Sequence, residues 1–133
     1  MEKKADLIEP KTTNIGYKGA LGGSKEAILG RKGEEFAVID NYLCIRMPKE
    51  VDHHGAAGIR ECADRLILDD KVKNIVFDFE DTTFMDSSGL GIIIGRYRKI
   101  SCFGGKVYAI NTSDRIGRLL KASGMSSVIE IIA

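Results

Sequence analysis

The chain of 133 residues has no tryptophan, two histidines and three cysteines, and it contains no Cys-x-x-Cys pair. The cysteines, Cys44, Cys62 and Cys102, are odd in number and far apart, and His53 and His54 are neighbours. A disulfide framework and a zinc site are therefore not expected, since both need paired or clustered ligands. Reduced thiols are expected instead, with Cys44 and Cys62 as inert core residues and Cys102 as the reactive one.

The chain also lacks an excess of either charge: 20 basic residues oppose 19 acidic ones, for a formal net charge of +1. This balance argues against a nucleic-acid or membrane-surface partner, because proteins that bind such partners usually carry a strong basic excess. No apolar run approaches the roughly 20 residues of a membrane span, and no apolar signal core follows the start, M-E-K-K-A-D. We therefore expect a cytoplasmic protein with one domain long enough to bury a core.

Residues 1–34 differ in composition from the rest of the chain. They are polar and glycine-rich, and they show neither the period of a strand nor that of a helix. We expect a flexible N-terminal extension at 1–34, followed by a single domain at 35–133. Within the extension, Ser24–Leu29 has the pattern of a short helix that Gly30 would end.

From residue 35 onward, strand-like and helix-like segments alternate. Apolar runs at 36–39 and 42–47 flank the turn dipeptide Asp40-Asn41 and predict an antiparallel hairpin. The order β-β-α-β-α-β-α-β predicts an α/β fold with a mostly parallel mixed sheet, an antiparallel N-terminal hairpin strand and packed helices. The helices should begin after Asp52, within 86–89 and after Thr112 or Ser113, and the later strands are expected at 75–79, 107–110 and 128–132.

The segment T-F-M-D-S-S-G-L-G, residues 83–91, places two serines where a predicted strand ends and a predicted helix begins. In open α/β sheets ligands collect at this edge, and a helix N-terminus attracts anions. Ser87 and Ser88 therefore suit a helix cap, an anion site, a nucleophile or a phosphorylation target. Asp86 or Ser87 as an N-cap would stabilise the helix by about 1 kcal/mol without any further function.

A serine hydrolase that uses Ser88 is the alternative from another functional class. It would need a base and a nucleophile elbow, but Asp86 stands where the G-x-S-x-G motif has its first glycine. His53 and His54 would be bases without an orienting group, and two adjacent histidines cannot both face one metal ion on a helix. The Walker A and dinucleotide glycine patterns are absent as well. We therefore expect no enzymatic activity, no metal and no cofactor.

The helix after the two serines contains Gly91 and Gly95, and each glycine inside a helix costs about 1 kcal/mol relative to alanine. Two glycines on one face suggest the close approach of another backbone, either of this chain or of a partner. We expect Arg96 to lie away from the buried face of this helix. The apolar residues at helical spacing should line that face: Leu90, Ile93, Ile94 and Tyr97.

Three segments together resemble the STAS-domain anti-sigma factor antagonists, and most closely the sporulation members of that family. They are E-V-D-H-H at 50–54, N-I-V-F-D-F-E-D-T-T-F-M-D-S-S-G-L-G-I-I-I-G-R-Y-R-K-I at 74–100, and R-L-L-K-A-S-G-M at 118–125. The similarity runs from about Val38 to the C-terminus, with the predicted order of elements intact. The resemblance implies a STAS domain that acts as a switch rather than as a catalyst.

Family members bind an anti-sigma factor that is also a serine kinase, and they displace the sigma factor that it holds. The resemblance implies that this kinase, which supplies the bound ATP, phosphorylates Ser88 and thereby ends the binding, and that a PP2C-type serine phosphatase reverses the change. A monomer is expected, and an antagonist in a stress-response pathway is the alternative within the family. The implied surroundings of the phosphosite and partner-binding residues are Asp52, His53, Asp86, Ser87, Gly89 and Leu90.

The chain departs from the family pattern in three places. Lys49 stands where relatives usually have glycine, and Gly55 stands where they tend to have threonine. Relatives also commonly continue from the last strand into a further helix, which this sequence does not include. We expect the region of Ser24–Leu29 to pack in place of that helix and to cover Ile129 and Ile131.

Overall fold

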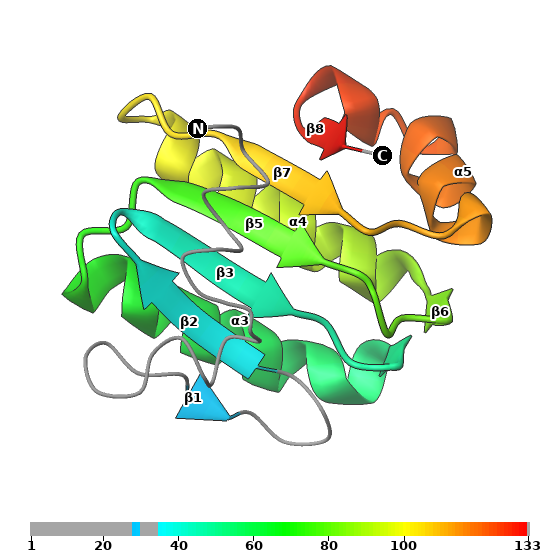
Figure 1. Cartoon of the computed structure of the whole chain (residues 1–133), viewed down its shortest axis with the longest axis horizontal. Helices are drawn as coiled ribbons and strands as arrows, with labels where there is room; N and C mark the ends of the chain where they lie inside the picture. The colour runs from blue at the N-terminus through cyan, green and yellow to red at the C-terminus, as the bar shows by residue number, and fades with distance from the viewer. Residues whose placement is uncertain (1–27, 30–34, 133) are drawn as a thin grey trace.

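The computed structural model describes residues 28–29 and 35–132. The strands in this part of the chain are β1 (Ile28–Leu29), β2 (Glu35–Ile39), β3 (Tyr42–Arg46), β4 (Glu50–Val51), β5 (Asn74–Asp78), β6 (Phe84–Met85), β7 (Val107–Ile110) and β8 (Glu130–Ile132). The helices are α3 (His53–Asp69), α4 (Ser87–Ser101), α5 (Asp114–Ala122) and a 3-10 turn, η1 (Met125–Ser127). One sheet has six strands in the order β1-β2-β3-β5-β7-β8, while β4 and β6 form a separate pair. This alternation of strands and helices confirms the predicted α/β class (Figure 1).

The predicted hairpin opens the six-stranded sheet. β2 and β3 are antiparallel, with Ile39 paired to Tyr42, and the turn residue Asp40 has a φ of 56°. Aspartate tolerates this left-handed backbone better than most residues, which explains why an Asp-Asn turn joins the two strands. The pairs β3-β5, β5-β7 and β7-β8 are all parallel, as predicted.

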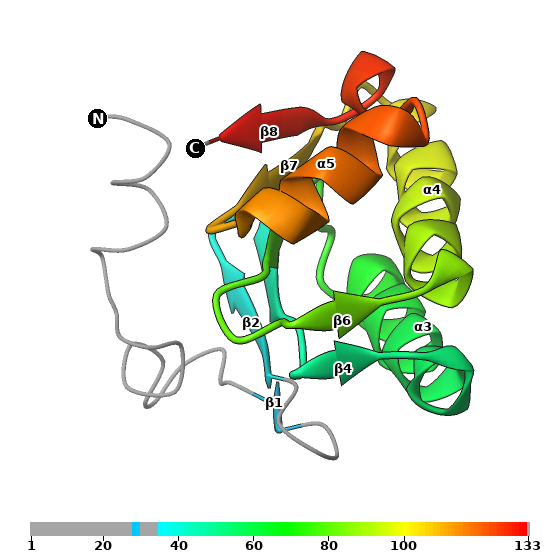
Figure 2. The ribbon, with the colours of Figure 1, turned by 90° about the vertical axis from the view of Figure 1, so that its right-hand side faces the viewer.

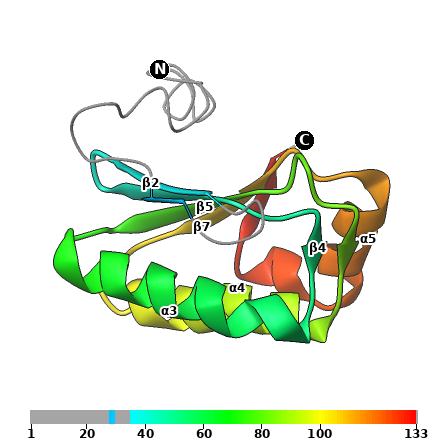
Figure 3. The ribbon, with the colours of Figure 1, turned by 90° about the horizontal axis from the view of Figure 1, so that it is seen from below.

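The helices α3, α4 and α5 lie on one face of this sheet (Figure 1 and Figure 3). The strand order advances in a single direction from β3 to β8, and crossovers between parallel strands are right-handed. Successive crossovers in the same direction place their helices on the same side, so the main core lies between these helices and the sheet. Its large, fully buried side chains include Phe36, Leu43, Ile45, Ile59, Phe77 and Ile93.

The N-terminal segment differs from its prediction where the structure describes it. Ile28–Leu29 form β1, an edge strand antiparallel to β2, rather than the end of a short helix. A single helical turn is marginal by itself, whereas an edge strand gains backbone hydrogen bonds from its neighbour. β1 and β8 lie at opposite edges of the sheet, so β1 cannot cover Ile129 and Ile131, which pack in the helix-side core. Residues 24–27 lie outside the described residues, and the domain boundary at residue 35 stays a prediction.

The buried face of α4 also differs from the predicted one. Ile93 is buried as expected, but Arg96, which was expected outside this face, is only 5% exposed, and Ile92 and Ile100 are fully buried. The reason is that α4 packs against α3 as well as against the sheet, where Asp64 Oδ1 lies 3.0 Å from Arg96 Nε. Burial lowers the pKa of Arg96, and the Asp64 carboxylate opposes that change. The other predicted residues are only half-buried: Leu90, Ile94 and Tyr97.

The glycines inside α4 do not mark a close contact with the described part of this chain. A Cβ atom at Gly91 or Gly95 would have no neighbouring atom within 4 Å. The intramolecular alternative is therefore wrong for these residues, and contact with a partner stays a prediction.

The end of the chain follows the prediction with one shift. Ser113 caps α5, accepting a hydrogen bond from Ile116 N at 3.1 Å, and Gly124 follows the helix with a φ of 84°. The turn η1 comes next, so β8 begins at Glu130 rather than at Val128. In the described part of the chain, no helix is both long and apolar enough to span a membrane.

Candidate functional site

The short parallel pair β4-β6 brings two distant loops together at the carboxyl edge of the sheet (Figure 2). Val51 pairs with Met85, and Asp86 N donates a hydrogen bond to Val51 O at 3.1 Å. Because α3 follows β4 and α4 follows β6, the two helices begin beside each other. The structure therefore gathers Asp52 and the first turn of α3 next to Asp86 and the first turn of α4.

Aspartates cap both helices. Asp52 accepts a hydrogen bond from Gly55 N at 3.1 Å, and Asp86 accepts one from Ser88 N at 2.8 Å. The predicted cap at Asp52 is confirmed, and of the two candidates in the second loop it is Asp86, not Ser87, that caps α4. Each cap satisfies a backbone N–H group that has no partner within its helix.

Because Asp86 provides the cap, Ser87 and Ser88 are the first two residues of α4, and their hydroxyl groups are not needed to hold the helix. Neither hydroxyl makes a hydrogen bond within the described residues. Ser87 is exposed and Ser88 is half-buried. A hydroxyl in the first turn of a helix lies where the partial positive charge of the N-terminus favours an anion.

Gly89 fixes the position of this first turn. The residue is buried, and a Cβ atom there would overlap the Met85 side chain and lie 3.1 Å from Val51 Cγ1. The backbone of α4 therefore rests directly on the β4-β6 pair, and a larger residue at position 89 would require the Met85 side chain to move. Leu90, the next residue, is half-buried and packs against the edge of the core.

The two histidines lie at the surface, at the start of α3. His53 and His54 are both exposed in the first turn of α3, with ring centroids 6.1 Å apart. Among the described residues there is no group of three metal-ligating side chains, and no hydrogen bond joins either histidine to Ser88.

Phe84, two residues before Asp86, is an exposed residue that the sequence pattern did not indicate. It lies in β6, its side chain is 40% exposed, and it pairs in register with Glu50 of β4. The only signal was an apolar residue two positions before the D-S-S-G motif, in a strand too short to show a period. Exposed aromatic side chains beside a polar site commonly contact a partner protein.

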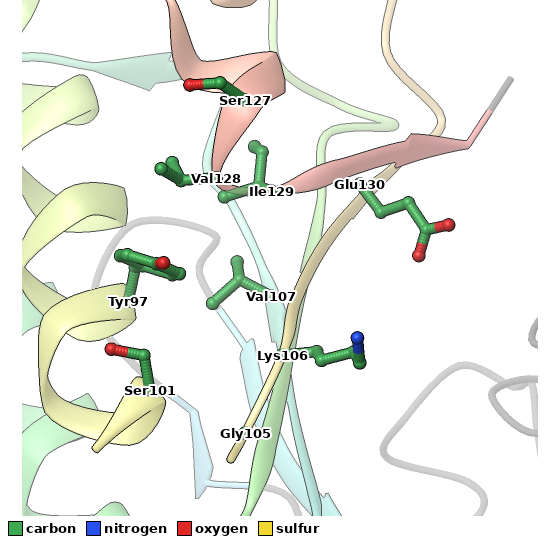
Figure 4. Close-up of a pocket in the computed structure, with 9 residues that line it drawn as sticks. All are labelled: Tyr97, Ser101, Gly105, Lys106, Val107, Ser127, Val128, Ile129 and Glu130. Atoms are coloured by element: carbon green, nitrogen blue, oxygen red, sulfur yellow. The ribbon is translucent and has the colours of Figure 1, made fainter. Parts of the chain in front are cut away.

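A concave region lies at the opposite end of α4, away from the serines (Figure 4). This groove of about 340 Å³ lies between the C-terminal half of α4 and the strands β7 and β8. Tyr97 and Val107 point into it, and it contains none of the residues predicted for the site.

Comparisons with known proteins agree with this geometry. Residues 35–133 match the STAS domain family. The chain is 36% identical over 89 residues to an anti-sigma F factor antagonist of Paenibacillus polymyxa. This alignment covers 67% of this chain and 76% of the relative. It also resembles the solved structure of the unphosphorylated anti-sigma factor antagonist SpoIIAA, with a TM-score of 0.69 and 27% identity over 76% of this chain and 89% of that one.

A second solved structure shows the phosphorylated form of the Bacillus cell fate determinant SpoIIAA. It matches with a TM-score of 0.63 and 27% identity, over 76% of this chain and 92% of that one. The predicted resemblance is thereby confirmed. The chain belongs to the STAS domain family and, within it, to the anti-sigma factor antagonists.

Proposed function

We propose that the protein binds an anti-sigma factor that is also a serine kinase, that this binding releases a sigma factor, and that phosphorylation of Ser88 ends the binding. The observation that carries the proposal is the state of the Ser88 hydroxyl. It lies in the first turn of α4 without an intramolecular hydrogen bond among the described residues, because Asp86 provides the helix cap. The group is thus available to a kinase at no cost to the fold.

A phosphate on Ser88 should leave the domain folded. It would carry about −1.5 to −2 charges at neutral pH, and the helix N-terminus offers backbone N–H groups and a favourable dipole. The Asp86 carboxylate opposes the phosphate, but a like-charge contact near the surface costs only on the order of 1 kcal/mol. The effect of the modification therefore falls on the interface rather than on stability.

The same phosphate should disrupt a packed interface. The surface around Ser88 includes the exposed ring of Phe84 and the half-buried Leu90, which a partner would cover. Bringing a dianion into such a desolvated contact without a matching cation can cost several kcal/mol, which corresponds to a loss of affinity of roughly a hundredfold or more. Asp52, His53 and Ser87 would line the same interface.

The remaining parts of the switch belong to its partners. We propose that the kinase brings the ATP, that a PP2C-type serine phosphatase removes the phosphate, and that the sigma factor is of the F type named for the relative from Paenibacillus polymyxa. These partners act together with the protein in the cytoplasm, and the antagonist itself acts as a monomer.

The test is to incubate the full chain with ATP and its cognate kinase and to locate the phosphate by mass spectrometry of peptides. Ser88→Ala should bind the kinase but accept no phosphate, whereas Ser87→Ala should be phosphorylated like the unmodified protein. Phosphate on Ser87 would overturn the assignment. An active-site serine probe should label nothing, and labelling of Ser88 would favour the hydrolase instead.

A further inference from the structure

The face of the six-stranded sheet that points away from α3, α4 and α5 carries a continuous band of apolar side chains, here called the second face. Its central row runs across four strands in register: Ala37, Cys44, Val76 and Tyr108. Ile39 and Tyr42 extend the band on one side of this row, and Ile110 and Ile132 extend it on the other. The rings of Tyr42 and Tyr108 stack with centroids 6.4 Å apart.

The strands themselves indicate that this face is covered in the folded protein. Their sequences are apolar without interruption, as in F-A-V-I, Y-L-C-I and V-Y-A-I, a pattern typical of strands buried on both faces. Cys44 and Val76 are fully buried, and burial raises the pKa of Cys44 to about 12. Yet the crossovers place no helix of the described residues on the second face (Figure 3).

The chain before β1 is long enough to cover this face and arrives at its edge. β1 pairs with β2 beside the second face, and residues 1–27 precede it. Adjacent strands lie roughly 4.8 Å apart, so about six extended residues at roughly 3.3 Å each would cross from β2 to β8. Residues 1–27 include apolar side chains that could contact the band, among them Ile15, Tyr17 and Leu21.

We propose that residues 1–27 pack across the second face and bury Tyr42, Cys44 and Tyr108. A tethered segment has an effective concentration on the order of millimolar, whereas a second copy or a separate partner acts only at its bulk concentration. The segment is therefore favoured over either of these as the occupant. This inference is independent of the switch at Ser88, which lies at the carboxyl edge of the sheet.

Photo-crosslinking in the full chain identifies the occupant directly. The photoreactive residue p-benzoylphenylalanine replaces Tyr42, and a matched control carries it at Leu68, which is 80% exposed on α3. A mixture of isotope-labelled and unlabelled protein separates links within one chain from links between chains. The expected result is a link from position 42 to a peptide of residues 1–27 in the same chain, with none from position 68. Links between chains, or no link from position 42, would overturn the proposal.

A second measurement avoids any substitution in the sheet. The rate of Cys44 alkylation is followed in a full chain carrying Cys62→Ser and Cys102→Ser. Adding Ile15→Asp and Leu21→Asp should raise that rate about tenfold or more by exposing the face. Thr12→Asp with Thr13→Asp adds the same charge to the segment and should leave the rate unchanged. Equal rates for the two double variants would overturn the proposal.

Discussion

The first turns of α3 and α4 share one sequence pattern and one type of cap, but their glycines differ in packing. Each helix begins with Asp-x-x-Gly, D-H-H-G at 52–55 and D-S-S-G at 86–89, with the aspartate as cap. A Cβ atom on Gly55 would have only Asp52 Oδ1 within 4 Å, at 3.9 Å, whereas one on Gly89 would overlap Met85. The position of Gly55 in α3 is thus open, while Gly89 in α4 lies against packed side chains. Packing at this glycine, rather than the cap, distinguishes the turn that carries the proposed phosphorylation site, Ser88.

The largest expected effect is on partner binding. Ser88→Asp should keep the fold but weaken binding of the anti-sigma factor by about a hundredfold or more, since it brings charge into the interface. His54→Asp places the same charge at the equivalent position of α3 and should weaken binding far less. Isothermal titration calorimetry of both variants measures the difference. Equal losses would show that any negative charge at this edge disrupts binding.

The next largest effect is on stability, at the two matched glycines. Gly89→Ala should destabilise the domain by about 1–3 kcal/mol, because the added methyl group overlaps the Met85 side chain and crowds Val51, so that both must move. Gly55→Ala should be neutral or stabilising by up to about 1 kcal/mol, since alanine is the better helix former where there is room. Urea unfolding of both variants measures the two changes. A destabilisation of similar size at both positions would contradict the contrast between the two turns.

The cap residues should give a smaller and nearly equal effect. Asp52→Ala and Asp86→Ala should each destabilise the protein by about 1 kcal/mol, because each leaves a backbone N–H group without its partner. The asparagine variants at both positions retain a side-chain oxygen that accepts the hydrogen bond and should lose less. The same unfolding assay gives these values, and an alanine variant as stable as the parent would show that water replaces the cap.

The three cysteines should have the smallest effect on stability but different reactivities. Cys102 follows α4 and is exposed, Cys62 in α3 is half-buried, and Cys44 is fully buried. Since the pKa of Cys44 is raised to about 12, that thiol stays protonated and unreactive at neutral pH. Alkylation followed by mass spectrometry should modify Cys102 first, and Cys102→Ala should change stability by less than about 0.5 kcal/mol. Rapid modification of Cys44 in the folded protein is the contrary outcome.

The elements that could be predicted are those with local signals. The Asp-Asn turn, the cap at Asp52 and the apolar runs of the hairpin act over a few residues, so the sequence displays them directly. The same holds for the D-S-S-G motif at the start of α4. Long alternation of strand and helix then determines the α/β class and the parallel order of the sheet.

What could not be predicted depends on contacts between distant segments. β4 and β6 have two residues each, too few for a period, and they exist because they pair with each other. Arg96 looks like a surface residue until α3 supplies Asp64 beside it. The strand at Ile28–Leu29 likewise forms because β2 offers a free edge. Each of these features is a tertiary effect that overrides local propensity.

The β4-β6 pair has a consequence for the order in which the protein folds. Its hydrogen bonds join loops far apart in the chain: Thr83 N donates to Lys49 O at 2.8 Å, and Thr82 Oγ1 donates to Pro48 O at 2.8 Å across 34 positions. Contacts of such long sequence separation close late, because loop entropy is lost before they form. The turn that presents Ser88 is therefore complete only in the finished fold. A synthetic peptide of residues 83–91 should accordingly be a much poorer kinase substrate than the whole protein. Phosphorylation would then regulate only correctly folded molecules.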